Sequence, residues 1–441
     1  MSEQALTGVV GTGGRELEIG RALAASGDVD IVYFFGGNAG MDEMPRGMNI
    51  PDISSSNYGA IVDFAAERDL FVVLGPEQPI VDGLGERLRE RGLSVFAPSP
   101  EAGRLESSKA WAVEFMRQHG IPHPASFIAR SAVNAADYMR SKRAAEYVIK
   151  ADGLAGGKGA FLEDSDEEAE QIVYGLMSGD LLKGAGKTIV FQERLHGPEA
   201  SAFVISDGEN WFLIPYISQD HKRLEDGDTG AMTGGVGAYA PVPETVVNAR
   251  QLEKIKDIAA KTIEGMQVEG KPYVGALYLG LMMAEEYDGD PMVIEYNVRF
   301  GDPEAEVVLP LLERSGVNIY NLLRSASDGE LDVPTHVRAA GQAALTVCLS
   351  ANGYPEAPVI GEEVYGLRQD RRDVIVHHAG TKLNADGRVV TSGGRSLFIT
   401  GFGETPDEAA ARAYAAIDFH RLGPDSDRIG FKDMQFRRDI G

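Results

Sequence analysis

The stretch MVIEYNVRFGD at residues 292–302 decides how the middle of this chain folds. Its apolar residues alternate with Val293, Glu295, Asn297 and Arg299, which is the period-two pattern of a β-strand with two different faces. Side chains on one face of a strand repeat every ~6 to 7 Å, so a carboxylate, an amide and a guanidinium line one surface. Glu295 and Asn297 offer the oxygen ligands that a divalent cation prefers, and Arg299 offers a fork for a carboxylate or phosphate. The pattern predicts a cation site beside an anion site; the ordinary alternative is an edge strand with a solvated polar face.

Length and charge limit the class of protein. A chain of 441 residues is too long for one core and predicts two to four domains. The formal charge of -25 opposes binding to nucleic acid or to an anionic membrane. The 53 glycines exceed the usual share of ~7% and gather in short clusters, which favours backbone sites for ligands.

Cysteine usage and the N-terminal residues indicate the compartment. Cys348 lies in the apolar run ALTVCLS, where we expect a buried structural thiol in a reducing environment. The first residues lack the basic and apolar segments of a signal peptide, and no run approaches ~18 apolar residues. We therefore expect a cytoplasmic protein without a membrane partner.

The first hundred residues repeat a strand, a loop and a helix. Strands at residues 6–10, 31–35 and 71–75 lead into the clusters GTGG, GGNAG and PEQP, and helical periodicity follows at 15–27 and 81–92. This alternation predicts a doubly wound parallel sheet with helices on both faces and ligands at the carboxyl ends of the strands. GTGGREL lacks the third glycine of a dinucleotide fingerprint, so we expect a small-anion site instead.

The rest of the chain predicts α+β domains. A strand, a glycine loop and a strand occupy 144–163, further strands occupy 188–195 and 199–208, and a long helix runs over about 246–266. Beyond residue 336 the sequence changes to strands and turns with one helix at 406–418.

Domain boundaries follow from these changes in composition. We predict an N-terminal α/β domain at 1–103, a central domain of two subdomains at 104–335 with a lid at about 122–192, and a small C-terminal α+β domain at 336–441.

The glycine loop in the sequence VIKADGLAGGKG carries two lysines, Lys150 and Lys158. Backbone N–H groups of such a loop can cradle phosphate oxygens while the lysines neutralise them. The loop lacks the hydroxyl of a P-loop, because Ala160 follows GGKG. Taken alone, a mobile surface hairpin explains the loop as well.

The segment TIVFQERLHGPEAS at residues 188–201 supplies a further element. A strand that runs into a short connection exposes backbone groups able to pair with an adenine edge, and Glu193 or Glu199 could accept from amine or ribose hydroxyl groups. A solvated hairpin remains the alternative.

An ordered series of motifs covers nearly the whole chain. In order they are GTGGRE, GGNAG, GPEQPI, LESSKAW, VIKADGLAGGKG, GPEAS, SQDHKR, DTGAMTGGVGAY, IEYNVRFGDPE, HAGTK, SGGR and RRDIG. This series resembles that of the phosphoribosylamine-glycine ligases, the glycinamide ribonucleotide synthetases of purine biosynthesis. The resemblance implies an ATP-grasp fold, in which two α+β subdomains clamp ATP, and an ADP-forming carbon-nitrogen ligase. It implies ATP and Mg²⁺ (or Mn²⁺) as cofactors and glycine and 5-phosphoribosylamine as substrates, in a monomer or small homo-oligomer.

The resemblance also implies roles for individual residues. It places Glu295 and Asn297 on the metal and Arg299 on the glycine carboxylate or acyl phosphate. It places near the reacting groups Asp220, His221 and Lys222. It assigns to ATP Lys109, Lys150, Gly153, Gly156, Gly157, Lys158, Gly159, Gln192, Glu193, Leu195 and Glu199. It assigns to the sugar phosphate and amine Gly11, Gly13, Gly14, Gly37, Asn38, Gly40, Gly75, Pro76 and Glu77.

Several positions depart from the family's usual pattern. Leu17 replaces a histidine, Gly36 a proline, Gln192 a glutamate and Val236 a methionine, and Ala231-Met232 stands where Pro-Asn is usual. Most of these lie in the region expected to hold the amine or sugar phosphate. An ATP-grasp ligase for a different phosphorylated amine therefore stays open, as does a silent nucleotide-binding regulator; a purely structural protein would need no such strand.

Overall fold

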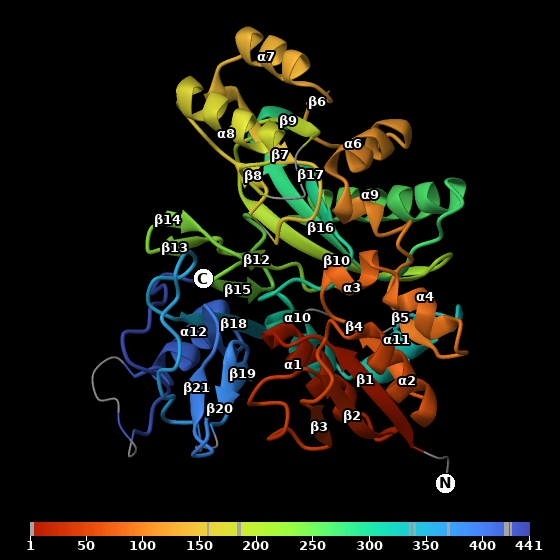
Figure 1. The fold of residues 1–441 in the computed structure, drawn as a ribbon, viewed down its shortest axis with the longest axis vertical. Helices are drawn as coiled ribbons and strands as arrows, with labels where there is room; N and C mark the ends of the chain where they lie inside the picture. Colours follow the sequence, from red (N-terminus) through yellow and green to blue (C-terminus); the bar gives the residue numbers. More distant parts are fainter. Residues whose placement is uncertain are drawn as a thin grey trace.

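The computed structural model describes residues 4–156, 158–182, 187–334, 337, 341–367, 371–418, 423 and 426–441. In Figure 1 the N-terminal part lies at the bottom, the C-terminal part at the lower left and a lid at the top. The boundary predicted at 335 and 336 falls outside the described residues.

The N-terminal sheet is parallel throughout, with the strand order β3-β2-β1-β4-β5. Its strands are β1 (Ala5–Val10), β2 (Val29–Phe35), β3 (Gly47–Ile50), β4 (Phe71–Leu74) and β5 (Val95–Phe96). The order reverses around β1, so the loop after β1 opens into the crevice where such sheets bind ligands. The predicted doubly wound sheet is confirmed.

Helices cover both faces of this sheet. One face packs against α2 (Tyr58–Arg68), α3 (Glu77–Val81) and α4 (Leu84–Arg89). The other face packs against α1 (Gly14–Ala24) and against α10 (Ala305–Arg314) and α11 (Ile319–Ser327), which come from much later in the chain. A helix lies within the stretch predicted at 81–92, but its bounds are wrong: Val81 is the last residue of α3, and Gly83, with φ +81°, is the N-cap of α4.

The lid is a four-stranded sheet in the order β6-β9-β7-β8. Its strands are β6 (Ser126–Ala129), β7 (Tyr147–Ala151), β8 (Ala160–Phe161) and β9 (Ile189–Glu193), covered by α7 (Ala132–Ser141) and α8 (Asp166–Ser178). The predicted glycine loop joins β7 to β8. Two helices, α5 (Arg104–Ser107) and α6 (Lys109–Gln118), lead into the lid from the N-terminal domain.

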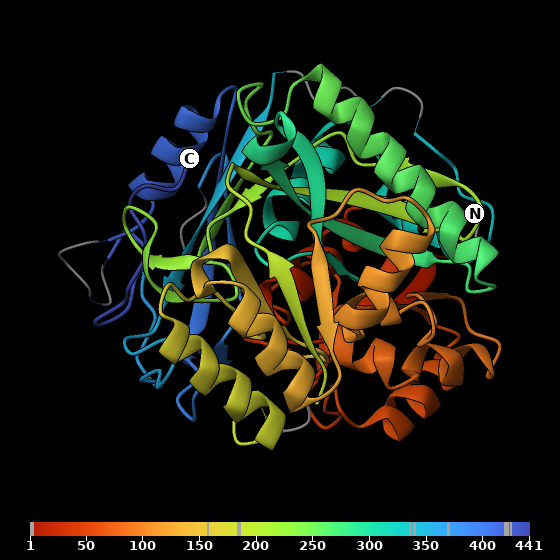
Figure 2. The same cartoon turned by 90° about the horizontal axis from the view of Figure 1, so that it is seen from above.

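The central sheet has the order β11-β10-β16-β17 and is antiparallel. Its strands are β10 (Glu199–Asp207), β11 (Trp211–Leu213), β16 (Val274–Ala284) and β17 (Asp290–Asn297). The long helix α9 (Ala249–Val268) packs on it and begins three residues later than predicted, because Asn248 and Gln251 form a capping box. From above, α9 (green) and the lid helices (yellow) lie on opposite sides (Figure 2).

A bulge changes the faces of β17. Gly280 pairs with Glu295 and Leu281 with Val293, which leaves Ile294 as an extra residue. Val293 is therefore buried in the same core as Tyr296, whereas strict alternation placed it beside Glu295. The prediction is wrong for Val293 and Ile294, because one inserted residue reverses the side to which the preceding side chains point.

The C-terminal sheet, in the order β12-β15-β18-β22-β19, is built from two distant segments. Its strands are β12 (Gln219–Asp220), β15 (Gly237–Ala240), β18 (Ala343–Ser350), β19 (Val374–His378) and β22 (Arg395–Gly403), and α12 (Pro406–Ala415) packs on it. Two hairpins accompany it, β13 (Arg223–Glu225) with β14 (Thr229–Met232) and β20 (Thr381–Leu383) with β21 (Val389–Thr391). Burial raises the pKa of Cys348 on β18 to about 12, as expected for a structural thiol.

In the part of the chain that the structure describes, no helix has the length and apolar character needed to cross a bilayer.

Replacement of Gly20 by alanine tests the packing of α1 on the sheet. A Cβ atom at Gly20 would lie 2.2 Å from the ring of Phe34, so Gly20→Ala overpacks the core. We expect destabilisation by about 1–3 kcal/mol, measured as a lower midpoint in thermal unfolding. Gly27→Ala is the control, because nothing lies within 4 Å of a Cβ there; equal midpoints for the two variants would contradict this packing.

Candidate active site

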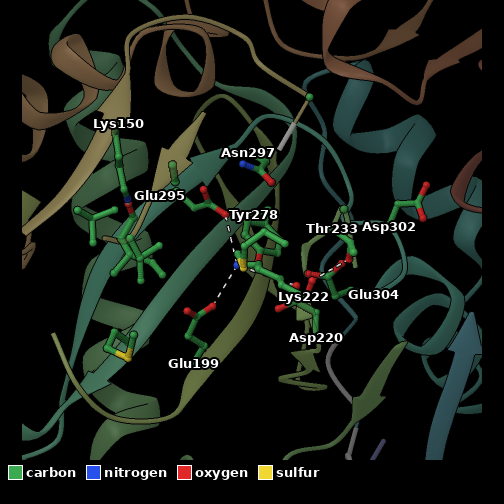
Figure 3. Close-up of a pocket in the computed structure, with 18 of the residues that line it drawn as sticks. Lys150, Glu199, Asp220, Lys222, Thr233, Tyr278, Glu295, Asn297, Asp302 and Glu304 are labelled. Carbon is green, nitrogen blue, oxygen red and sulfur yellow. Dashed lines mark hydrogen bonds and ion pairs between the residues drawn. The ribbon is translucent and has the colours of Figure 1, made fainter. Parts of the chain in front are cut away.

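A cavity of about 380 Å³ lies where the lid, the central sheet and both terminal domains meet. Figure 3 shows Lys150 on one side of it, Asp302 on the other and the side chains of Glu295 and Lys222 between them. The N-terminal domain contributes Pro76 and Glu77, and the C-terminal domain contributes Arg395. Residues predicted from five separate motifs therefore share one cavity.

Lys222 is the centre of the charged cluster. Its Nζ atom lies 3.0 Å from Glu199 Oε2, 3.8 Å from Glu295 Oε1 and 4.0 Å from Asp220 Oδ2. The four side chains come from three strands and the turn after β12. The predicted grouping of Asp220 and Lys222 with the Glu295 strand is present in the structure.

Burial and neighbouring charges set the protonation states in the cavity. Burial alone would raise the pKa of Glu295, but Lys222 and Lys150 lower it to about 2. Burial lowers the pKa of Lys150 to about 8, although Glu295 opposes the shift. Burial raises the pKa of Asp220 although Lys222 opposes it. At neutral pH the cavity thus presents an ionised Glu295 between ammonium groups.

Two of the predicted lysines lie at the root of the lid. Lys150 Nζ donates a hydrogen bond to Ile294 O at 2.7 Å, which ties β7 to the bulge of β17. Lys109, the first residue of α6, donates to Glu106 O at 3.2 Å and lines a small adjoining cavity with Lys150 and Glu295. Lys158 is exposed and does not line the main cavity.

The glycine loop reaches the cavity through one of its predicted glycines. Gly156 lines the cavity and has φ +56°, and Gly153 has φ +131°, so both adopt backbone conformations that favour glycine. Gly159 is buried, and Gly157 lies outside the described residues.

The connection from the lid to the central sheet forms one wall. Gln192, only 3% exposed, and Leu195 line the cavity. Glu193 also lines it, but its carboxylate accepts hydrogen bonds from Ala125 N and from the hydroxyl of Tyr287. Sequence reasoning missed the apolar side chains that complete this wall, which are Val148, Leu162, Met282 and Ile294. Strand periodicity had assigned Ile294 to the core, and the bulge turns it into the cavity.

Arg299 joins the central sheet to the N-terminal domain. Its Nε atom lies 3.2 Å from Glu77 Oε2, and its Nη2 atom lies 3.4 Å from Glu106 Oε1. Glu106 in turn accepts a hydrogen bond from Val298 N at 2.7 Å. Arg299 lines the cavity together with Glu77, whereas Glu106 does not line it.

A second cavity, of about 510 Å³, adjoins the first and shares Asp302 and Arg395 with it. The loops after β1 and β2 contribute Gly13 and Gly37, two of the predicted residues. The opposite wall carries residues that sequence reasoning did not single out, namely Tyr354, Gly380, Thr381, Lys382, Ser392 and Gly393. The motifs HAGTK and SGGR held the signal, but nothing in their spacing showed that they face the N-terminal loops.

Other predicted glycines pack against side chains instead of lining a cavity. A Cβ atom at Gly11 or Gly75 would lie 2.4 Å or 2.2 Å from the side chain of Glu16. The carboxylate of Glu16 accepts a hydrogen bond from Gly13 N at 2.7 Å and so fixes the loop after β1. Gly14 packs against Glu306 and Phe398, and Gly40 packs against His378.

Asn38 holds two loops together. Its Nδ2 atom donates to Thr12 O at 3.0 Å and to His378 O at 2.7 Å. Because Asn38 is buried, it shapes the second cavity from behind.

His221 does not line either cavity, and the prediction that it approaches the reacting groups is wrong. Asp220 and Lys222 face the main cavity, so the residue between them points the other way. Burial and Arg437 lower the pKa of His221 to about 4, which keeps it neutral.

The residues that depart from the family's usual motifs lie in two kinds of place. Leu17 and Val236 lie in apolar cores. Gly36 lines the second cavity, and Gln192 and Met232 line the first.

The fold and the cavity between lid and central sheet define an ATP-grasp enzyme. Three consecutive segments match the domains of phosphoribosylglycinamide synthetase: the N domain over residues 7–106, the ATP-grasp (A) domain over 107–305 and the C domain over 344–441. The chain belongs to the phosphoribosylglycinamide synthetase family, as the motif series had indicated.

Individual relatives agree over the full length. The chain is 40% identical to a phosphoribosylamine–glycine ligase of Yersinia pestis over 437 residues, which cover 98% of this chain and 97% of the relative. It spans only 53% of the bifunctional purine biosynthetic protein PUR2,5 of Pichia angusta, with 39% identity. The crystal structure of the Thermotoga maritima phosphoribosylamine–glycine ligase superposes with a TM-score of 0.82 at 35% identity, covering 99% of this chain and 100% of that one. A biotin carboxylase of Campylobacter jejuni shares the fold, with a TM-score of 0.75 at 15% identity, 99% of this chain and 93% of that one being covered.

Removal of Lys222 tests the charged cluster. Lys222→Met leaves Glu199, Asp220 and Glu295 without their shared counter-ion, so we expect a loss of about 1–3 kcal/mol at pH 8. Lys222 lowers the pKa values of Asp220 and Glu295, so its removal raises both in the folded state, and the loss shrinks as the pH falls toward 5. Thermal unfolding at both pH values measures the change.

Lys256→Met is the matched control, because the pair of Lys256 with Glu253 on α9 is exposed and contributes little. A Lys222→Met deficit that is the same at pH 8 and pH 5 would speak against this electrostatic origin.

Proposed function

We propose that this chain ligates glycine to 5-phosphoribosylamine with ATP, giving glycinamide ribonucleotide, ADP and phosphate through a glycyl phosphate intermediate. The observation that carries the proposal is the pair of adjoining cavities, one lined by lysines and carboxylates and the other by glycine loops and Lys382. Membership of the phosphoribosylglycinamide synthetase family supports the same reaction. We propose that the protein acts in the cytoplasm and that it is a monomer or a small homo-oligomer.

The nucleotide end of the main cavity is proposed to hold ATP. Gln192, Glu193 and Leu195 stand where a base would meet a strand edge, beside an apolar wall. Lys150 lines the main cavity and Lys109 lines the small cavity beside it, where their ammonium groups would offset phosphate charge. Gly156 lines the cavity, and closure of its loop over bound phosphates would keep water out.

Glu295 and Asn297 are proposed to hold Mg²⁺ or Mn²⁺. Both line the cavity, and the pKa of Glu295 keeps its carboxylate ionised, so the donor set fits a hard cation that also binds phosphate oxygens. Within the described residues no group of three or more His, Cys, Asp or Glu side chains forms a metal site, which fits a cation completed by the nucleotide. Such a cation would neutralise charge on the transferring phosphoryl group.

Phosphoryl transfer requires two anions to approach each other. The glycine carboxylate attacks the γ-phosphorus, and Arg299 and Lys222 supply positive charge in the cavity where the acyl phosphate forms. Arg299 lies against Glu77 and Glu106, so it is oriented before substrate binds. We assign Arg299 to the carboxylate and Lys222, with Asp220, to the reacting centre.

The second cavity is proposed to hold the sugar phosphate of the amine substrate. Gly13 and Gly37 allow backbone to approach a phosphate, and Lys382 and Arg395 provide cations on the facing wall. Asp302 and Arg395 form the wall that the two cavities share, so the amine of a substrate in the second cavity would lie beside the acyl phosphate in the first.

Purified protein incubated with ATP, Mg²⁺ and glycine tests the proposal, with and without freshly prepared 5-phosphoribosylamine. We expect ADP release that depends on both glycine and the amine, together with glycinamide ribonucleotide detected by mass spectrometry. A panel of other phosphorylated amines tests the alternative that Gly36 and Met232 admit a different partner. Absence of amine-dependent ADP release would refute the ligase proposal.

Replacement of Glu295 by glutamine tests the metal assignment. Glu295→Gln removes the ionised oxygen ligand but keeps the shape, so we expect turnover to fall by at least ~100-fold with an unchanged circular dichroism spectrum. Glu285→Gln is the control, because Glu285 is exposed in the turn after β16. An active Glu295→Gln variant would show that the metal lies elsewhere.

A further inference from the structure

Asp302 lies at the seam between the two cavities and lines both. Its Oδ1 atom lies 3.0 Å from Arg395 Nη1, which also donates a hydrogen bond to Asp302 O at 2.7 Å. A Cβ atom at Gly13 would lie 3.2 Å from Asp302 Oδ2, so this oxygen borders the glycine loop. The carboxylate is therefore fixed at the boundary that an amine in the second cavity would have to reach.

A second carboxyl group lies beneath this seam. Glu306, in the first turn of α10, is fully buried, and neither of its side-chain oxygens has a hydrogen-bond partner in the described structure. Its Oε1 atom would lie 2.5 Å from a Cβ at Gly14. Burial, followed by the charge of Asp302, raises the pKa of Glu306 well above its ordinary value. The raised pKa favours the neutral form of Glu306, and Asp302 is the carboxylate that lies against Arg395.

We propose that Asp302 is the base that accepts the proton from the attacking amine in the second half of the reaction. This inference rests on the proposed function and adds to it a catalytic residue in the amine-transfer step. The carboxylate touches both cavities, and Arg395 holds it in place from the C-terminal domain.

The step balances without a further reactant. The amine nitrogen forms a bond to the carbonyl carbon of glycyl phosphate, and the bond from that carbon to the phosphate oxygen breaks, so phosphate leaves with the electron pair. The nitrogen loses one proton to Asp302, which then releases it to solvent or to the departing phosphate. A weak base suffices. The amine nitrogen becomes positively charged when it bonds to the carbonyl carbon, and its N–H is then far more acidic than an N–H of the free amine.

Asp302 differs from Glu199, Asp220, Glu295 and Glu304 because those four carboxyl groups line the main cavity alone, away from the proposed amine site. Lys222 lies against Glu199, Asp220 and Glu295, and Glu304 Oε1 accepts a hydrogen bond from Ser201 Oγ at 3.2 Å. The charged and titratable groups near Asp302 and Glu306 on the neighbouring elements include Arg15, Glu16, Arg395, Cys348 and Tyr354, and Glu16 is paired with Arg15 at 2.6 Å. Arg15 and Arg395 are cations, and the thiol and phenol are raised in pKa by burial and stay neutral.

Two measurements on Asp302→Asn separate the half-reactions. Glycine-dependent exchange of ¹⁸O between the β,γ-bridge and the β non-bridging positions of ATP reports phosphoryl transfer, and glycinamide ribonucleotide formation reports amine transfer. We expect the exchange to stay within about threefold of the unmodified protein while the amine step falls by at least ~100-fold. Asp288→Asn, the same change in an exposed turn, should alter neither rate.

Further variants keep the test decisive. Asp302→Glu retains the carboxylate and should recover at least tenfold of the rate lost in Asp302→Asn. Asp302→Ser, with a smaller polar side chain, replaces the asparagine variant if that one fails to fold. An amine step within about fivefold of normal, or an equal loss of exchange and amine transfer, overturns the role as base. Unmodified protein without exchange and without product overturns the proposed function as well.

Discussion

The ion pairs of Arg299 are the interaction on which the rest of the site depends. The guanidinium lies at the end of β17 and binds Glu77 of the N-terminal domain and Glu106 at the entrance to the lid. Because a buried cation must be paired, movement of the central sheet away from these two elements would leave Arg299 as an uncompensated buried charge. The cavity is consequently placed where these parts of the chain meet, and Arg299 lines it beside Glu77.

Segments from the middle of the chain complete the cores of both terminal domains, which reinforces this junction between the domains. Helices α10 and α11 leave the central sheet and cover the N-terminal sheet, and strands β12 and β15 join the C-terminal sheet. Neither terminal domain can form its complete core without a segment from the middle of the chain. The cavities therefore have walls shared between domains, and Lys222 and Asp302 are carried by segments that connect one core to the next.

The two kinds of charge in the site have separate tasks. Lys150 and Lys109 lie at the root of the lid, where they would meet phosphates, and carboxylates surround Lys222 in the centre. Burial lowers the pKa of Lys150 to about 8. The side chain is therefore mostly protonated at neutral pH but loses its proton at a slightly higher pH. Closure of a lid on phosphates would raise the pKa of Lys150, since each anion favours the protonated lysine.

The sequence by itself determined the parallel N-terminal sheet, the glycine lid and the carboxylate strand, because these follow from local periodicity and from residue types at fixed spacing. The roles expected for Lys150, Glu295 and Arg299 follow from the ordered motif series, which is visible in the sequence alone. Only the tertiary structure decided the bulge at Ile294, the outward turn of His221 and the meeting of Lys382 with Gly13. These depend on pairing between segments distant in sequence, where one inserted residue or one shared strand changes which side chains face the cavity.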